Sequence, residues 1–139
     1  MGGGPTGAEL AGALAEIARQ PLVRDFRAID PAQARIILLE GGGRVLPTYP
    51  EDLSRSAEEQ LREIGVEVRT STVVTAIEPG RLRIGDSVLP AAVTLWAAGV
   101  LASPLGAALG TPLDRVGRVQ VQPDLSLPGH PEVFVIGNV

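Results

Sequence analysis

The sequence contains no cysteine and a single histidine, His130, among its 139 residues. The lack of cysteine excludes disulfide bonds, thiol redox chemistry and cysteine-ligated metal sites, and one histidine argues against a histidine-ligated metal. We therefore predict no metal ligand and no catalytic residue, so that any redox chemistry must come from a bound cofactor.

Basic residues and long apolar runs are also scarce. The chain has 12 Lys and Arg against 16 Asp and Glu, which gives a net charge of −4. Nucleic-acid binding needs clustered Lys and Arg, so we exclude nucleic acid as a partner. No apolar run approaches the roughly 20 residues of a spanning helix, and we expect no membrane span.

Glycine, in contrast, is abundant at the start of the chain. Gly2, Gly4 and Gly7 follow the G-x-G-x-x-G spacing, with Pro5 and Thr6 between the second and third glycines. In a dinucleotide-binding domain these glycines give a tight turn, a close backbone approach to pyrophosphate and tight packing of helix on sheet. Only Met1 precedes the motif where a strand is required, so the alternative is an ordinary glycine-rich turn before a helix.

The residues after the loop predict a helix. The segment 9–19 is rich in Ala and Leu, and Leu10, Leu14 and Ile17 fall at helical spacing as one apolar stripe. The positive end of such a helix favours an anion at the loop.

A short apolar run at 36–39, closed by Glu40 and three glycines, predicts a buried parallel strand. In a dinucleotide-binding fold an acid at this strand end accepts hydrogen bonds from the adenosine ribose. Glu40 lies later in the chain than in the minimal unit, and the segment 21–34 accounts for the difference. The alternative is a solvated carboxylate at a strand end.

The rest of the chain predicts further helices and strands. We expect a helix over 50–64 with Leu53, Ala57, Leu61 and Ile64 on one face and Gly65 as its stop. The segments 66–70, 73–77, 81–84 and 87–90 are expected to form an antiparallel meander. A strand over 93–100 ends in small residues that would let a flat ligand lie against the backbone, or that simply allow close packing. A short helix in 101–110 and strands at 118–121 and 133–136 complete the prediction.

The predicted fold class is therefore α/β: a Rossmann-like dinucleotide-binding domain with a central parallel sheet and a small antiparallel meander, lacking its first strand. The strands at 36–39 and 93–97 would then lose a neighbour, and we expect the apolar segment 133–136 either to fill that place or to remain unpaired.

Five blocks, taken in order, resemble the type II NADH dehydrogenases, which are non-proton-pumping, FAD-dependent NADH:quinone oxidoreductases on a membrane face. The similarity spans nearly all of the chain. The blocks are the glycine motif through Gly12, the Ile37–Glu40 strand end with Arg44–Pro47, Trp96–Val100, Asp114–Val119, and Pro128–Pro131 with Val133–Gly137.

The resemblance implies the NADH-binding domain of such a flavoenzyme, with cofactors NADH and FAD and with quinone as partner. NADH would place its pyrophosphate on Gly2, Gly4, Pro5, Thr6 and Gly7, its ribose on Glu40, and its nicotinamide past Glu9, Ala98 and Gly99. Residues 1–115 would form the NADH-binding domain, and 116–139 the returning segment of a flavin-binding domain. The parent enzyme would be peripheral on the inner, cytoplasmic face of the cell membrane.

The sequence also departs from the family. It has no separate FAD-binding domain with its own glycine loop, so we expect FAD to be held mainly by a domain that this sequence does not contain. Where the family has Gly-Asp at the flavin, this chain has Gly137 and Asn138, and an amide cannot accept with two oxygens as a carboxylate does. For Glu9 the alternative is a first-turn acid that favours the helix dipole.

Three functional hypotheses follow: part of a flavoenzyme, a nucleotide-binding module without turnover, or a fragment with no independent role. Within the enzymes, a ferredoxin reductase relative is the alternative to the quinone reductase. We expect Trp96 to lie in the core and His130 to be a turn residue.

Overall fold

The structure is a computed structural model that describes residues 1–19 and 30–137. Most of the predicted 21–34 segment and the predicted flavin contact Asn138 lie outside the described residues. The chain forms two compact units, Met1–Gly99 and Val100–Val139. Within the described ranges no helix is long and apolar enough to cross a membrane.

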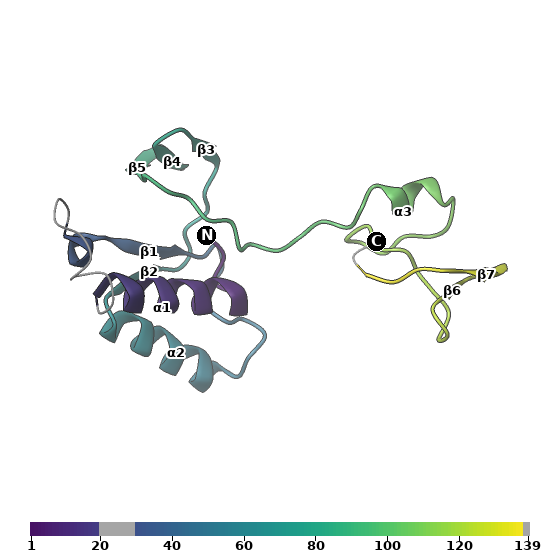
Figure 1. The fold of residues 1–139 in the computed structure, drawn as a ribbon, viewed down its shortest axis with the longest axis horizontal. Helices are drawn as coiled ribbons and strands as arrows, with labels where there is room; N and C mark the ends of the chain where they lie inside the picture. The colour runs from purple at the N-terminus through teal and green to yellow at the C-terminus, as the bar shows by residue number, and fades with distance from the viewer. Residues whose placement is uncertain (20–29, 138–139) are drawn as a thin grey trace. The chain divides into compact units, whose positions relative to one another are not determined.

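The first unit is built on a parallel strand pair. Its elements are, in chain order, α1 (Pro5–Arg19), the 3-10 helix η2 (Pro31–Gln33), β1 (Ile36–Leu39), α2 (Glu51–Glu63) and β2 (Val66–Arg69). β1 and β2 pair in parallel from Ile36 opposite Val66 to Leu39 opposite Arg69. The connection between them runs through α2, as parallel pairing requires. Figure 1 shows both helices on one side of this pair.

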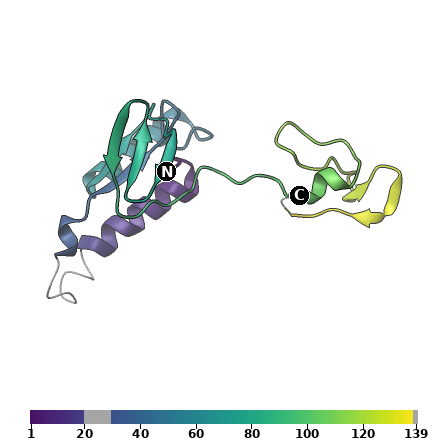
Figure 2. The same cartoon turned by 90° about the horizontal axis from the view of Figure 1, so that it is seen from above.

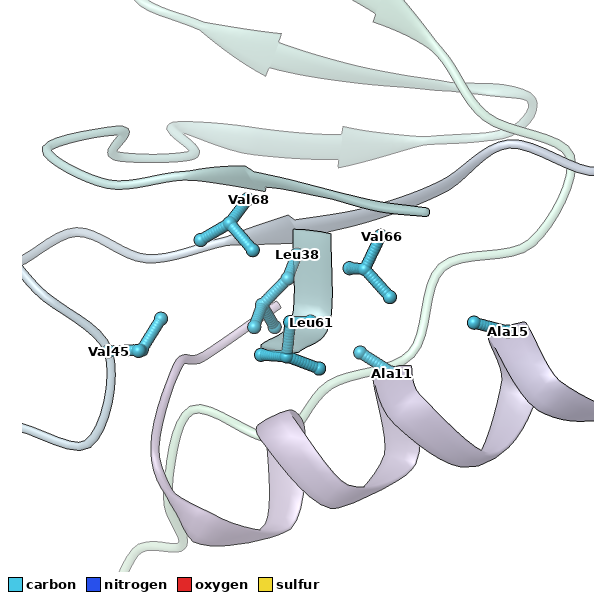
Figure 3. Packing of buried hydrophobic residues seen from close by; sticks show 7 residues of the cluster. All are labelled: Ala11, Ala15, Leu38, Val45, Leu61, Val66 and Val68. Carbon is cyan, nitrogen blue, oxygen red and sulfur yellow. The ribbon is translucent and has the colours of Figure 1, made fainter. Parts of the chain in front are cut away.

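The core lies between the two helices and the strand pair (Figure 3). It consists of small and branched apolar side chains from all four elements and the loop after β1: Ala11, Ala15, Leu38, Val45, Leu61, Val66 and Val68. A layered α/β core of this kind, with a short parallel sheet, confirms the α/β class of the prediction.

α1 turns a different face to the core from the one predicted. Its buried residues are Gly7, Ala11, Ala15 and Ala18. Leu10, Leu14 and Ile17 are 37%, 36% and 44% exposed, so the predicted apolar stripe does not face the core. The buried face carries small residues, and at Gly12 an added Cβ would lie in ordinary van der Waals contact, 3.7 Å from Ile64 Cδ1. α1 also begins at Pro5, before the predicted start, because proline suits the first turn of a helix.

α2 follows the prediction in extent, and its buried face differs from the prediction only at the start, since Leu61 is buried and Ile64 packs against the core as predicted. Pro50 and Ile64 flank it, and Gly65 follows with a φ of +80°, which favours glycine. Leu53 is 52% exposed, whereas Ser54 and Leu61 are buried. At the start of α2, Ser54 therefore takes the buried place that was predicted for Leu53.

Residues 66–70 were expected in the antiparallel meander, and that expectation is wrong, because β2 pairs with β1 instead. The meander consists of β3 (Ala76–Glu78), β4 (Arg81–Ile84) and β5 (Ser87–Pro90), with order β3-β4-β5. β4 and β5 join through the predicted two-residue turn, whose Gly85 has a φ of +56°. Figure 1 shows the meander on the side of the strand pair away from the helices.

The predicted strand 93–100 is not a regular strand. In the described chain its backbone pairing runs through Met1 alone: the Met1 ammonium donates to the Leu95 carbonyl at 2.7 Å, and Ala97 N donates to the Met1 carbonyl at 2.8 Å. One residue cannot make a ladder. Trp96 is 62% exposed, so its predicted place in the core is wrong.

The second unit contains α3 (Leu105–Ala108), within the predicted 101–110 range, and the hairpin of β6 (Ser126–Leu127) and β7 (His130–Phe134), drawn in yellow in Figure 2. Residues 118–121 form no strand, only a single bridge between Leu113 and Val119. β7 pairs with β6, and Val135 N donates to the Leu125 carbonyl at 3.0 Å, so the segment 133–136 is not left unpaired. The predicted division at residue 115 stays a prediction.

Candidate nucleotide-binding site

The glycine loop is folded so that two of its glycines cannot be replaced. Gly2 has a φ of +96°, and a Cβ on it would lie 2.5 Å from the Ala97 carbonyl oxygen. A Cβ on Gly7 would lie 1.8 Å from the Gly2 carbonyl oxygen. Since real Cβ atoms do not approach other atoms this closely, Gly2 is needed for the turn and Gly7 for packing the helix against the loop.

The middle glycine of the motif faces open space. A Cβ on Gly4 would meet no atom within 4 Å. Gly4 is followed directly by α1, whose first residues are Pro5 and Thr6, and Ala8 N donates to the Gly4 carbonyl at 3.0 Å. The N–H groups of the first turn have no partner within a helix, so this open surface offers backbone donors to an anion.

Glu9 lies on α1 beyond its first turn, which contains no acidic residue, and it is exposed. The alternative that Glu9 is a first-turn acid is therefore wrong, because the helix begins four residues before the predicted start at Glu9. Its side chain remains available to a ligand, and its predicted place near nicotinamide stays a prediction.

Glu40 connects the two loops at the end of β1. Its Oε2 accepts from Gly3 N at 2.5 Å and its Oε1 accepts from Gly42 N at 2.6 Å. Glu40 is partly exposed, with both carboxylate oxygens bonded to backbone N–H groups, and its place at the ribose stays a prediction. The two bonds fix the carboxylate between the glycine loop and the loop 41–47.

The loop 41–47 is held by three further contacts. Leu46 N donates to the Gly3 carbonyl at 2.7 Å. The Ser54 hydroxyl, 1% exposed, donates a short hydrogen bond to the carbonyl of Val45, which is fully buried. The Arg44 guanidinium donates to the carbonyls of Pro47 at 2.8 Å and Tyr49 at 3.0 Å. The backbone around Glu40 is therefore fixed before any ligand binds.

Two cavities meet at Glu40. One, of about 610 Å³, is lined by Gly42, Arg44, Pro47 and Ser54 among others. The other, of about 420 Å³, runs from Gly2 and Gly4 past Glu40 to Thr72, Val73 and the segment 96–99. The second cavity follows the carboxyl ends of the strands, where open α/β sheets bind their ligands.

Ala98 and Gly99 line this second cavity with Trp96. Gly99 has a φ of +92°, and a Cβ on it would meet nothing within 4 Å. Gly99 thus leaves space, whereas the Ala98 backbone packs closely against the glycine loop, since a Cβ on Gly2 would lie 2.6 Å from Ala98 N. The indole N–H of Trp96 donates to the Gly99 carbonyl at 3.2 Å. Gly137 belongs to the second unit and has a φ of +92°.

The structure therefore brings together the predicted residues Gly2, Gly4, Gly7, Glu40, Ala98 and Gly99 within the first unit. Sequence reasoning missed Gly3, Gly42 and Ser54, because the first two act through backbone N–H groups that leave no pattern. Ser54 could have been suspected, because it lies next to Leu53, which was predicted to face the core. Within the described ranges no cluster of His, Asp and Glu could hold a metal. His130 begins β7 next to the β6–β7 turn, with Nδ1 at 3.4 Å from Glu132 Oε1.

Comparison with known proteins gives the family and the relatives. The sequence profile of the pyridine nucleotide-disulphide oxidoreductase family matches residues 1–139. The whole chain is 42% identical to the type II NADH:quinone oxidoreductase NdhA of Mycobacterium tuberculosis and 43% identical to Ndh of the same organism. It covers 32% of each, so the chain spans about a third of the length of these curated relatives.

Solved structures share the fold. An FAD-dependent pyridine nucleotide-disulphide oxidoreductase from Desulfovibrio vulgaris superposes with a TM-score of 0.74 at 23% identity, over 98% of this chain and 32% of that one. NDH2 from Plasmodium falciparum, in complex with NADH, gives a TM-score of 0.67 at 23% identity, over 75% of this chain and 22% of that one.

Proposed function

Because this chain belongs to the pyridine nucleotide-disulphide oxidoreductase family, we propose that it is the NADH-binding part of an FAD-dependent NADH:quinone oxidoreductase. The quinone reductase assignment is supported by the 42% and 43% identity to type II enzymes over the whole chain. When bound, NADH supplies hydride and FAD accepts it.

The main support for the nucleotide site is Glu40, which accepts hydrogen bonds from Gly3 N and Gly42 N. The carboxylate lies at the end of β1 and is bonded to the glycine loop through Gly3, so a ribose on Glu40 and a pyrophosphate over Gly4 would be neighbours. The residues fit the ligand: Gly4 leaves a surface that a side chain would fill, while Gly2 and Gly7 can carry no side chain. In this role Glu40 accepts from ribose hydroxyls, and the first turn of α1 donates to phosphate.

The remaining roles follow the cavity that connects Gly4 to the segment 96–99. Ala98 and Gly99 would leave room for the flat nicotinamide ring, with Glu9 on the adjoining helix. Gly137 and Asn138 would contact the flavin, with Asn138 contributing an amide in place of a carboxylate. FAD would be held mainly by a domain outside this sequence, and the parent enzyme would be a peripheral protein on the inner face of the cell membrane.

Titration of the 139-residue chain with NADH, followed by nucleotide fluorescence, tests the proposal. We expect saturable binding that weakens about tenfold or more in Glu40→Gln, since charged acceptors make the stronger hydrogen bonds. Glu59→Gln, an exposed acid on α2, is the matched control and should bind as the parent chain does. No binding by a folded chain, or equal loss in both variants, would reject the nucleotide site.

A further inference from the structure

Three residues other than glycine, within the ranges 1–19 and 30–137, have a positive φ: Leu46 (+48°), Ser71 (+50°) and Leu125 (+69°). A Cβ crowds the backbone in this region, so each conformation is strained and persists only where its surroundings hold it. Leu125 lies in the second unit, whereas Leu46 and Ser71 lie in the first, in the loops after β1 and β2. The contacts of Leu46 and Ser71 show what this strain holds in place.

Both strained residues of the first unit bond to a glycine. Leu46 N donates to the Gly3 carbonyl at 2.7 Å, and Ser71 N donates to the Gly42 carbonyl at 2.7 Å. Gly3 and Gly42 are the same two residues whose N–H groups donate to the Glu40 carboxylate. Each glycine is therefore held at both of its backbone groups, by a strained residue at its carbonyl and by Glu40 at its N–H.

The position of the Glu40 carboxylate depends on these two glycines. Glycine has the widest choice of backbone conformation, so its N–H keeps one direction only when neighbouring groups hold it. The contacts with Glu40 are also close, since a Cβ on Gly3 would lie 3.0 Å from Glu40 Oε2 and a Cβ on Gly42 would lie 3.0 Å from Glu40 Oε1. A movement of either glycine would therefore displace the carboxylate.

The strained residues are themselves fixed by the loops around them. Tyr49 N donates to the Leu46 carbonyl at 3.0 Å. Next to Ser71, Thr72 N donates to the Glu40 carbonyl at 2.8 Å. Strain that is over-determined by neighbouring bonds in this way is retained without a ligand and is common at binding sites.

We propose that Leu46 and Ser71 are positioning residues that set the nucleotide preference of the site, because they fix the Glu40 carboxylate where a 2′-phosphate would lie. This inference rests on the proposed function. A carboxylate on a freely rotating side chain can turn away from a 2′-phosphate and then discriminates weakly. A carboxylate held by two backbone N–H groups must break those bonds to turn away, so it accepts from ribose hydroxyls and repels the phosphate.

Ser71 offers the cleaner test, because it is exposed and its replacement changes mainly the preference of the backbone. Ser71→Val should disfavour the left-handed conformation, which β-branched residues rarely adopt, whereas Ser71→Asn should retain it. For the 139-residue chain we expect NADH to bind at least about tenfold more tightly than NADPH, and Ser71→Val to reduce this ratio to about threefold or less. Ser71→Asn should keep the ratio of the parent chain.

Leu125→Val is the matched control, because it introduces a β-branched residue at the strained position of the second unit. It should keep the ratio of the parent chain. If Ser71→Val does not fold, Ser71→Thr is the smaller β-branched change and should shift the ratio in the same direction.

Hydrogen exchange without nucleotide, measured by NMR, tests the contact itself. In the folded Ser71→Val chain the Gly42 amide should exchange about threefold or more faster than in the parent chain, since its carbonyl loses a partner, while the amides of β1 should be unchanged. An unchanged Gly42 amide, or an NADH to NADPH ratio equal to that of the parent chain, would overturn the inference and leave the proposed function standing. Loss of the preference in Ser71→Asn as well would assign it to the hydroxyl and also overturn the inference. A folded parent chain that binds neither nucleotide would reject both.

Discussion

Gly7 has the least room of the glycines in the loop, because its Cβ position lies 1.8 Å from the Gly2 carbonyl oxygen. A Cβ on Gly4, in contrast, would have no other atom within 4 Å. We expect Gly7→Ala to lower the free energy of unfolding by about 2 kcal/mol or more, since backbone must move. Gly4→Ala should change it by less than about 0.5 kcal/mol, yet weaken NADH binding because its methyl group would occupy the proposed phosphate surface.

Urea unfolding and NADH titration of both variants check this pair of expectations. A Gly4→Ala chain that binds NADH as well as the parent chain would show that the phosphate does not lie over Gly4.

In its proposed role at the ribose, Glu40 also predicts which nucleotide binds more tightly. A 2′-phosphate about 4 Å from its carboxylate would cost roughly 4 kcal/mol at an effective dielectric near 20, and salt reduces this. We expect Arg44 not to pair with the phosphate, because its guanidinium already donates to the Pro47 and Tyr49 carbonyls. We expect NADH to bind at least about tenfold more tightly than NADPH, and titration with each nucleotide measures the ratio.

Glu40→Gln should move this ratio toward one, and Arg44→Ala should leave it unchanged. Equal affinities of the parent chain for the two nucleotides would remove Glu40 from the ribose role. A larger preference in Arg44→Ala would show that Arg44 reaches the nucleotide.

At the scale of elements, α2 is tied to the loop after β1 by one buried hydroxyl. The Ser54 side chain donates to the carbonyl of Val45, and both residues are buried. Ser54→Ala leaves that carbonyl without its partner, which should lower the free energy of unfolding by about 1–3 kcal/mol. Ser56→Ala, an exposed serine of the same helix, is the control for urea unfolding and should change it by less than about 0.5 kcal/mol. Equal effects would show that the Ser54 hydrogen bond contributes nothing.

The parallel strand pair carries a charge contact that makes its stability depend on pH. Hydrogen bonds from Arg35, and then from Arg69, hold the pKa of the Glu67 carboxyl below its ordinary value of 4.5. A carboxyl pKa that is lower in the folded state raises the free energy of unfolding above pH 4.5. This contribution is lost as the pH falls through the folded-state pKa. Because these charged side chains are exposed, Glu67→Gln should lower the free energy of unfolding by only about 0.5 kcal/mol at pH 7, and this difference should shrink below pH 4.5.

Urea midpoints of the parent chain and Glu67→Gln, measured from pH 7 to pH 3, give this difference, with Glu59→Gln as control. A difference that stays constant over that range would assign the effect of the substitution to something other than the charge.

The elements that the sequence predicts correctly depend on local signals. β1 is an apolar run ended by glycines, and β4 and β5 flank a two-residue turn, so neighbours in the chain are sufficient. The buried face of α1 was predicted wrongly, since the small residues Ala11 and Ala15 are buried while the larger Leu10 and Leu14 stay partly exposed. The segment 93–97 depends on a distant neighbour, and a strand without one has no ladder. The partners of Glu40 are backbone N–H groups, which no side-chain pattern reveals.

At the scale of the whole molecule, the two units differ in how much they bury. The first unit has the apolar cluster of Figure 3, formed by two helices, two strands and a loop. Within residues 100–137 the buried side chains are few, and only Val119 and Leu127 are large and apolar. Large apolar side chains remain exposed there, with Leu101 at 89%, Ile136 at 73% and Phe134 at 63%. This unit has too small a core to order its own backbone strongly.

Hydrogen exchange of the whole chain should therefore divide at the boundary between the units. Amides of β1, β2 and α1 should be protected by the cooperative unfolding of the first unit, whereas those of β7 and α3 should exchange through local opening with a free energy near zero. Low urea should accelerate exchange in the first unit only, since local opening exposes little new surface. Residue-resolved exchange at 0 and about 1 M urea measures both properties. If β7 were protected as strongly as β1, with the same urea dependence, the second unit would share the cooperative unfolding of the first, and its exposed apolar side chains would have to be stabilised by contacts beyond those within 100–137.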